Sequence, residues 1–293
     1  MTSLRQHMLE DMQVRNLSVA TQTTYTRQIS QFARHFSMSP EMLGPEHIHS
    51  YQVYLTNEKK LATSSILIAV AALRFLYKVT LCKEWNIGDI IPAPKKPQRL
   101  PVVLSSEEVR HFLSCVAPLK HRTILTTCYA AGLRISEAIS LKPTAIDSKR
   151  MVIRIEQGKG QKDRYVMLSP RLLDILRQWW HKERPKVWLF QGNDTGQHIT
   201  KDAVEAACQH ARQISGIQKP VTPHSLRHAF AVHLLESGTD IRRIQLLLGH
   251  RSLATTAQYL RIATSSVCST TSPLDLLPLP PTTEDCTPVV QYF

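Results

Sequence analysis

The chain has 293 residues, 43% of them hydrophobic, which is enough for two domains with separate cores. Its formal net charge of +13 favours polyanionic partners such as nucleic acid, although a solvated basic surface gives the same charge. The six cysteines lack the short paired spacing of zinc or redox sites, the N-terminus does not resemble a signal peptide, and the longest apolar run, 66–73, is shorter than a bilayer span. We therefore expect a cytoplasmic protein without a membrane segment.

Residues 1–91 are predicted to form a small helical bundle. Tyr25, Ile29, Phe32 and Phe36 recur at helical spacing and make one apolar face. Further helices are expected to start at Pro45 and at Ser64 or Ser65. Residues 92–101, rich in proline and basic side chains, have the composition of an extended linker and mark the domain boundary.

Residues 102–267 are predicted to form a second domain of mixed α+β structure. Ser105 and Glu108 form a capping-box pattern at a helix start, and a later helix ends at Gly132. The β-prone runs 151–156 and 164–168, joined by a glycine-containing turn, predict an antiparallel hairpin. Other helix starts are expected at Ser169, Thr200 and Thr222, and helix stops at Gly216, Gly238 and Gly249.

The fold expected from these patterns is mainly α, with a small antiparallel sheet inside the second domain. From residue 268 onward the chain is rich in threonine, serine and proline, which forbids a continuous helix. We interpret residues 268–293 as a C-terminal tail, either without order or inserted as an extended apolar segment into the groove of a partner.

His224 and Arg227 stand three residues apart directly after Pro223. If Pro223 opens a helix, both side chains project from its first turn, where free backbone N–H groups and the helix dipole favour a bound phosphate. The same pair also fits a solvated basic helix face. By itself, this motif is weak evidence for an anion site.

A second histidine lies close to a tyrosine further along the chain. Gly249 is expected to end a helix and to place His250 at a turn, while Ser252 caps the next helix, which carries Tyr259. This arrangement tethers a histidine near a phenol, although Tyr259 could equally be a core aromatic.

Two further cations complete the candidate set. Arg134 follows Gly132 at the start of a predicted helix, where a structural pairing with Glu137 is the alternative to ligand binding. Lys159 lies between two glycines at the tip of the predicted hairpin, from which a flexible cation can reach a ligand.

These motifs become specific through their order: GLRxSE, GKGxKxR, HxxRH, LGH, and a tyrosine nine residues after that histidine. With them the chain resembles the tyrosine recombinase (phage integrase) family, and is most similar to its Xer-like and transposon or integron integrases. The resemblance extends over the helical first domain, the linker and the LSxEEV entry to the second domain, as far as about residue 265. It implies a SAM-like core DNA-binding domain followed by a catalytic domain.

The resemblance also implies a role for each matching residue. Arg134 and Arg227 clamp the non-bridging oxygens of the scissile phosphate, and Lys159 protonates the leaving 5′ oxygen. His224 assists proton transfer at the nucleophile, and His250 hydrogen-bonds the phosphate. Tyr259 is the nucleophile and forms a 3′-phosphotyrosyl bond.

The chemistry agrees with this assignment, because a phenol with an ordinary pKa near 10 needs a nearby base and a positive field to attack. The surrounding donors stabilise the transition state where other enzymes use metal ions, so we expect no metal or other cofactor. The bond energy kept in the phosphotyrosine makes ATP unnecessary for religation.

The expected partner is double-stranded DNA, bound by a homotetramer on two sites, with no membrane and no small-molecule substrate. Candidate DNA contacts outside the catalytic set are Lys95, Lys96, Arg99, Lys162 and Arg164. Three other functions stay open: a type IB topoisomerase, a catalytically inactive DNA-binding protein, and an RNA-binding or metabolic protein. The last of these leaves the ordered motifs unexplained.

Overall fold

The computed structural model describes residues 2–94, 102–156, 163–193 and 196–262. The chain divides into two compact units, residues 1–99 and 100–293, called here the N-terminal and C-terminal units. The predictions for Lys95, Lys96, Arg99, Lys159, Lys162 and the tail, 268–293, concern residues outside the described ranges.

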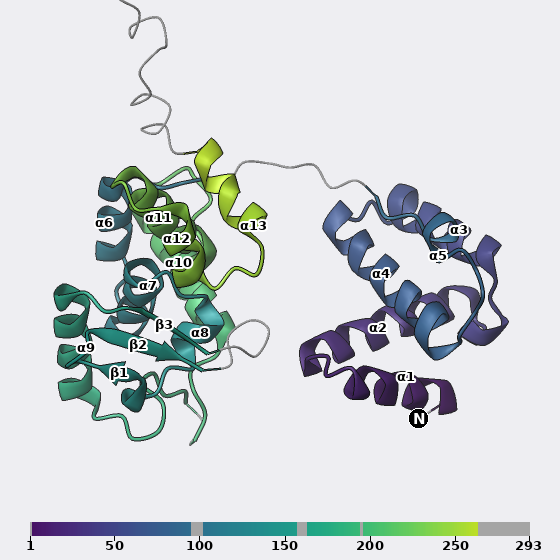
Figure 1. The fold of residues 1–293 in the computed structure, drawn as a ribbon, viewed down its shortest axis with the longest axis horizontal. Helices are drawn as coiled ribbons and strands as arrows, with labels where there is room; N and C mark the ends of the chain where they lie inside the picture. Colours follow the sequence, from purple (N-terminus) through teal and green to yellow (C-terminus); the bar gives the residue numbers. More distant parts are fainter. Residues whose placement is uncertain (1, 95–101, 157–162, 194–195, 263–293) are drawn as a thin grey trace, which may run out of the picture. The chain divides into compact units, whose positions relative to one another are not determined.

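The N-terminal unit is a helical bundle, drawn from purple to blue in Figure 1. Its α-helices and short π- and 3-10-helical segments are α1 (Ser3–Val14), α2 (Val19–Phe36), η1 (Pro40–Met42), α3 (Pro45–Val53), η2 (Tyr54–Glu58), α4 (Thr63–Phe75), η3 (Leu76–Thr80) and α5 (Ile87–Ile90). The predicted apolar face of α2 is present, since Ile29 and Phe32 are buried against α4. Helix α4 starts at Thr63, one residue before the predicted start.

One segment of this bundle, Thr63–Thr80, is long and apolar enough by length and composition to cross a membrane. The sequence analysis gave a shorter apolar segment, 66–73, because it counted only uninterrupted apolar residues and therefore stopped before Arg74. Core helices pass the same test, and here Ile66, Val70, Leu73 and Tyr77 are buried in the core of the unit.

The C-terminal unit combines helices with a small sheet (Figure 1). Its elements are α6 (Ser106–Ser114), α7 (Leu119–Ala130), α8 (Ile135–Ile139), η4 (Pro143–Ala145), β1 (Ile146–Asp147), β2 (Val152–Ile155), β3 (Arg164–Met167), α9 (Pro170–Glu183), α10 (Lys201–Ser215), α11 (Pro223–Glu236), α12 (Ile241–Leu248), α13 (Leu253–Ala257) and η5 (Gln258–Arg261). Helix α7 contacts α11, α9, α10 and α6, so it lies at the centre of the unit.

The sheet is antiparallel with the order β1-β2-β3. The predicted hairpin is confirmed by the pairing of β2 with β3, in which Ile153 lies opposite Val166 and both are buried. Strand β1 was not predicted, because its two residues are too few for an alternating pattern.

The capping residues define most helix ends as predicted. Ser105, Ser169, Thr200 and Thr222 each accept a backbone N–H at the start of a helix, and Gly249 ends α12 with a φ of 63°. One prediction was wrong: Ser252 caps α13, but that helix stops at Ala257, and Tyr259 lies in the tighter 3-10 turn η5.

Candidate active site

Arg227 is the most deeply buried charge of the site, with 1% of the residue exposed. It lies in the first turns of α11, and its Nη1 and Nη2 atoms donate to the carbonyl oxygens of Gly132, at 2.6 Å, and Leu248, at 2.5 Å. Burial, followed by the charge of Arg134, lowers its pKa to about 10, so the guanidinium stays charged at neutral pH. The fold therefore holds a permanent positive charge where α7, α11 and α12 end or begin.

Glu137 compensates several of the buried positive charges. Its carboxylate accepts two hydrogen bonds from Arg164, at 2.7 and 2.8 Å, and one of 2.7 Å from Nη1 of Arg134. Nη1 of Arg227 lies 3.7 Å from the same carboxylate. Burial raises the pKa of Glu137, but the hydrogen bond and charge of Arg164, together with Arg134, outweigh it and hold the pKa at about 2.

These contacts clarify two of the sequence predictions. The structural pairing of Arg134 with Glu137 exists, yet 21% of the Arg134 side chain stays exposed, so the same guanidinium can also reach a ligand. The Arg164 side chain, predicted as a DNA contact, is only 12% exposed and also donates to the Leu247 carbonyl. Arg164 thus donates hydrogen bonds to groups within the protein, Glu137 and Leu247, which argues for a structural role.

Two histidines project from α11 beside Arg227. His224 lies in the first turn, and its ring is 4.3 Å from that of His228, one turn later. His224 keeps part of its surface exposed, but desolvation of its ring by the surrounding protein, together with the charges of Arg227 and Arg134, lowers its pKa. Burial, His224 and Arg227 lower the pKa of His228 to about 4, so at neutral pH His228 is uncharged.

Tyr259 is 1% exposed and packs with Phe230, Ile244 and Leu248. Its hydroxyl lies 2.8 Å from Nδ1 of His228. Burial raises its pKa, while the positive charge of Arg227, a hydrogen bond with Gln258 and the charge of Arg134 lower it in part. The core aromatic suggested by the sequence and the candidate nucleophile are thus the same buried side chain.

His250 flanks Tyr259 from the turn after α12. The two rings are nearly parallel, with centroids 6.4 Å apart and planes at 17°. Nδ1 of His250 lies 2.9 Å from the Thr256 hydroxyl, a hydrogen bond that fixes the ring. Burial, followed by the charges of Arg227 and Arg134, lowers the pKa of His250 to about 4.

The structure therefore brings together five of the six predicted catalytic residues: Arg134, His224, Arg227, His250 and Tyr259. Three arginines, Arg134, Arg164 and Arg227, face the carboxylate of Glu137. The lowered pKa values of His228 and His250 leave both rings neutral at pH 7. This excess of positive charge in a partly desolvated site suits an anion such as a phosphodiester.

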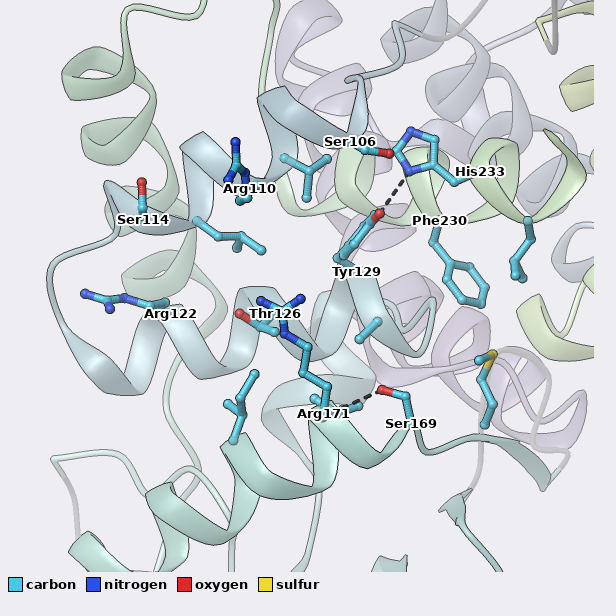
Figure 2. Close-up of a pocket in the computed structure, with 17 residues that line it drawn as sticks. Ser106, Arg110, Ser114, Arg122, Thr126, Tyr129, Ser169, Arg171, Phe230 and His233 are labelled. Carbon is cyan, nitrogen blue, oxygen red and sulfur yellow. Dashed lines mark hydrogen bonds between the residues drawn. The ribbon is translucent and has the colours of Figure 1, made fainter. Parts of the chain in front are cut away.

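The described residues also enclose a cavity of about 610 Å³ elsewhere in the C-terminal unit, between α6, α7, α9 and α11. Its wall includes Arg110, Arg122 and Arg171 beside apolar side chains, as Figure 2 shows. None of the five residues named above lines it, so the candidate chemistry lies outside this cavity.

Comparison with known proteins identifies the family. Residues 103–266 match the model of the phage integrase family, and residues 4–87 match the phage integrase N-terminal SAM-like domain. The chain belongs to the phage integrase family. Integrases of this family are tyrosine recombinases, DNA strand-exchange enzymes, and this chain carries out site-specific recombination by DNA cleavage and rejoining.

Similar proteins support this membership. The integrase/recombinase-type protein y4qK of Sinorhizobium fredii is 66% identical over 294 residues, covering 100% of this chain and 95% of y4qK. Tyrosine recombinase XerD of Lacticaseibacillus casei is 32% identical, covering 85% and 90% of the two chains. A solved structure of XerH recombinase bound to its difH substrate has a TM-score of 0.69 over 90% of this chain and 84% of that chain; its identity of 23% supports the fold alone.

Two contacts of this integrase site were not predicted from the sequence. His228 contacts Tyr259, and Glu137, which was considered only as a partner of Arg134, also binds Arg164. His228 follows Arg227 directly and lies four residues after His224, so helical spacing alone could have placed it beside His224. The sequence had no signal for the contact with Tyr259, because it joins positions 31 residues apart.

Proposed function

We propose that Tyr259 attacks a DNA phosphodiester and forms a 3′-phosphotyrosyl intermediate. The observation that supports this most strongly is that the buried Tyr259 lies within the electrostatic reach of both Arg227 and Arg134. In this mechanism the two guanidinium groups bind the non-bridging phosphate oxygens, which suits their planar donor geometry. His224 assists proton transfer at the nucleophile, and His250 hydrogen-bonds the phosphate.

The protein environment accounts for how a phenol could react here. Burial raises the Tyr259 pKa, but each positive charge in the same desolvated region lowers the free energy of the phenolate. The arginines also stabilise the additional negative charge of the pentacovalent transition state. In this proposal Lys159, which lies outside the described residues, protonates the leaving 5′ oxygen.

Because fixed arginines supply the positive field, the proposed reaction needs no metal ion and no ATP. Among the described residues there is no group of three or more His, Cys, Asp or Glu side chains that could hold a metal. We expect cleavage to proceed unchanged in EDTA, and complete loss of cleavage after chelation would overturn this part of the proposal.

A nicked suicide substrate tests the nucleophile. Such a substrate releases the short strand after cleavage and traps the covalent protein–DNA adduct, which migrates slowly in a denaturing gel. We expect the wild-type protein to form the adduct and Tyr259→Phe to form none. Tyr129→Phe is a matched control, because the Tyr129 hydroxyl also bonds a histidine of α11, at 2.9 Å. An adduct formed by Tyr259→Phe would exclude Tyr259 as the nucleophile.

DNA is the partner of this integrase, and we propose a finer picture of the complex: four protomers acting on two duplexes in the cytoplasm, in DNA integration or the movement of a mobile element. The basic residues Lys95, Lys96, Arg99 and Lys162 are proposed as phosphate contacts, which release counterions on binding. DNA affinity should therefore fall steeply with salt. A flat salt response in fluorescence anisotropy would contradict these contacts, and sedimentation of the synaptic complex measures its stoichiometry.

A further inference from the structure

His228 is a half-buried side chain of the site to which the proposed reaction assigns no role. It lies on α11, directly after Arg227, and its Nδ1 atom is 2.8 Å from the Tyr259 hydroxyl. Because Tyr259 is only 1% exposed, water has little access to replace that contact.

We propose that His228 is a positioning residue for DNA cleavage, whose hydrogen bond holds the Tyr259 hydroxyl in the orientation from which it attacks phosphorus. This inference rests on the proposed role of Tyr259 as nucleophile. With the ring proton on Nε2, Nδ1 accepts the hydroxyl hydrogen, so this contact takes up neither lone pair of the oxygen that attacks the phosphate.

The surroundings of His228 suit an uncharged, fixed acceptor. The His224 ring packs edge-on against it, with ring planes at 71°, and limits its rotation. Burial, His224 and Arg227 lower its pKa to about 4. At neutral pH the ring therefore keeps one nitrogen unprotonated, as an acceptor requires.

The same helix contains a natural control for this contact. Five residues later, Nδ1 of His233 lies 2.9 Å from the Tyr129 hydroxyl, as Figure 2 shows. His233 also contacts the Leu104 carbonyl through Nε2, at 3.0 Å. The two pairs share their chemistry and their helix, but only the His228 pair includes the proposed nucleophile. Changes at His233 thus report what the loss of a tyrosine–histidine bond on α11 does to the fold.

The test measures single-turnover cleavage of the nicked suicide substrate at saturating DNA, with thermal unfolding and DNA binding measured on each variant. His228→Asn keeps an acceptor at the δ position, His228→Gln moves it by one bond, and His228→Leu removes it. We expect His228→Leu and His228→Gln to slow cleavage roughly 10- to 100-fold, because the reacting hydroxyl is then misplaced. His228→Asn should retain most of the wild-type rate. His233→Asn and His233→Leu should leave the rate within about twofold of wild type, because their bond does not touch the nucleophile.

Three outcomes would overturn the proposal: wild-type cleavage by His228→Leu, cleavage by His228→Asn as slow as by His228→Leu, or an equal loss of rate in the His233 variants. If His228→Leu fails to fold, the difference between Asn and Gln carries the test. A failure of the proposed function would be recognised independently. An adduct formed by Tyr259→Phe would exclude Tyr259 as the nucleophile, whatever the cleavage rates of the His228 variants.

Discussion

The N-terminal unit fills its interior with apolar side chains such as Phe32, Ile48 and Leu73, and its buried polar side chains among the described residues are Thr26 and Thr80. The C-terminal unit has a similar apolar core but also buries Arg227 and Glu137. A buried charge costs free energy unless it is paired, and even a paired one stabilises less than its Coulomb attraction suggests. The difference indicates that the C-terminal unit gives up stability to keep a charged site in place for an anion.

The largest expected effect tests this difference directly. Glu137→Ala removes the carboxylate that compensates Arg134, Arg164 and Arg227, so the C-terminal unit should lose about 3–5 kcal/mol of unfolding free energy. Phe32→Ala in the N-terminal unit should cost a similar amount, about 3–5 kcal/mol, through a cavity alone. Urea unfolding at pH 7 and pH 4 separates the two, because the stabilisation from the low pKa of Glu137 is lost as the pH falls below about 4.5, so only the Glu137→Ala cost should shrink on acidification. Costs that change equally with pH would contradict the account.

A smaller effect is expected from Arg227→Lys, which keeps the charge and removes the planar set of donors. The guanidinium of Arg227 donates to the carbonyl oxygens of Gly132 and Leu248. A single ammonium group cannot make both of these contacts and also offer two donors to a phosphate. We expect cleavage to fall by roughly 100-fold or more, as after loss of one transition-state donor. Arg177→Lys, at an exposed position of α9, is the matched control. A wild-type cleavage rate in Arg227→Lys would show that charge alone suffices.

Glycine substitutions should have intermediate effects. At Gly132, φ is +62° and an added Cβ would overlap the Phe230 ring, so Gly132→Ala should lose about 2–4 kcal/mol from strain and overpacking together. It should also slow cleavage, because the Gly132 carbonyl anchors Arg227. Gly216→Ala has a similar φ of +66° but open space around it, and should cost only about 1–2 kcal/mol. Thermal unfolding that ranks the two variants equally would remove the packing argument.

The smallest expected effect is a pH dependence of stability. The pKa values of His228 and His250 are lowered to about 4, mainly by burial, from an ordinary value near 6.5. Between these values the unfolded chain binds more protons than the folded one, so the C-terminal unit should lose stability as the pH falls from about 6.5 towards 4. The low pKa of Glu137 adds a further loss below about 4.5.

Urea unfolding at pH 7 and pH 5 measures this dependence. His228→Asn should show a weaker loss of stability on acidification than the wild type, because one of the two histidines is gone. If acidification to pH 5 stabilised the unit instead, the assignment of His228 and His250 as neutral, half-buried histidines would be wrong.

The sequence predicted what local patterns determine. Ser105, Thr222 and Gly249 mark helix ends through their own backbone preferences, and the β2–β3 hairpin follows from alternation around a turn. The sequence did not predict contacts between positions that are far apart in the chain. The salt bridge from Arg164 to Glu137 spans 27 residues, and the hydrogen bond from His228 to Tyr259 spans 31, and neither has a local pattern.

The most direct test of the account is to identify the amino acid that becomes linked to DNA. The adduct from the suicide substrate can be digested with nuclease and trypsin and analysed by mass spectrometry. Of the eight tyrosines in the chain, Tyr259 lies in the tryptic peptide 252–261, between Arg251 and Arg261. The account predicts a nucleotide attached through a 3′-phosphate to Tyr259 in this peptide. A nucleotide on any other residue would contradict it.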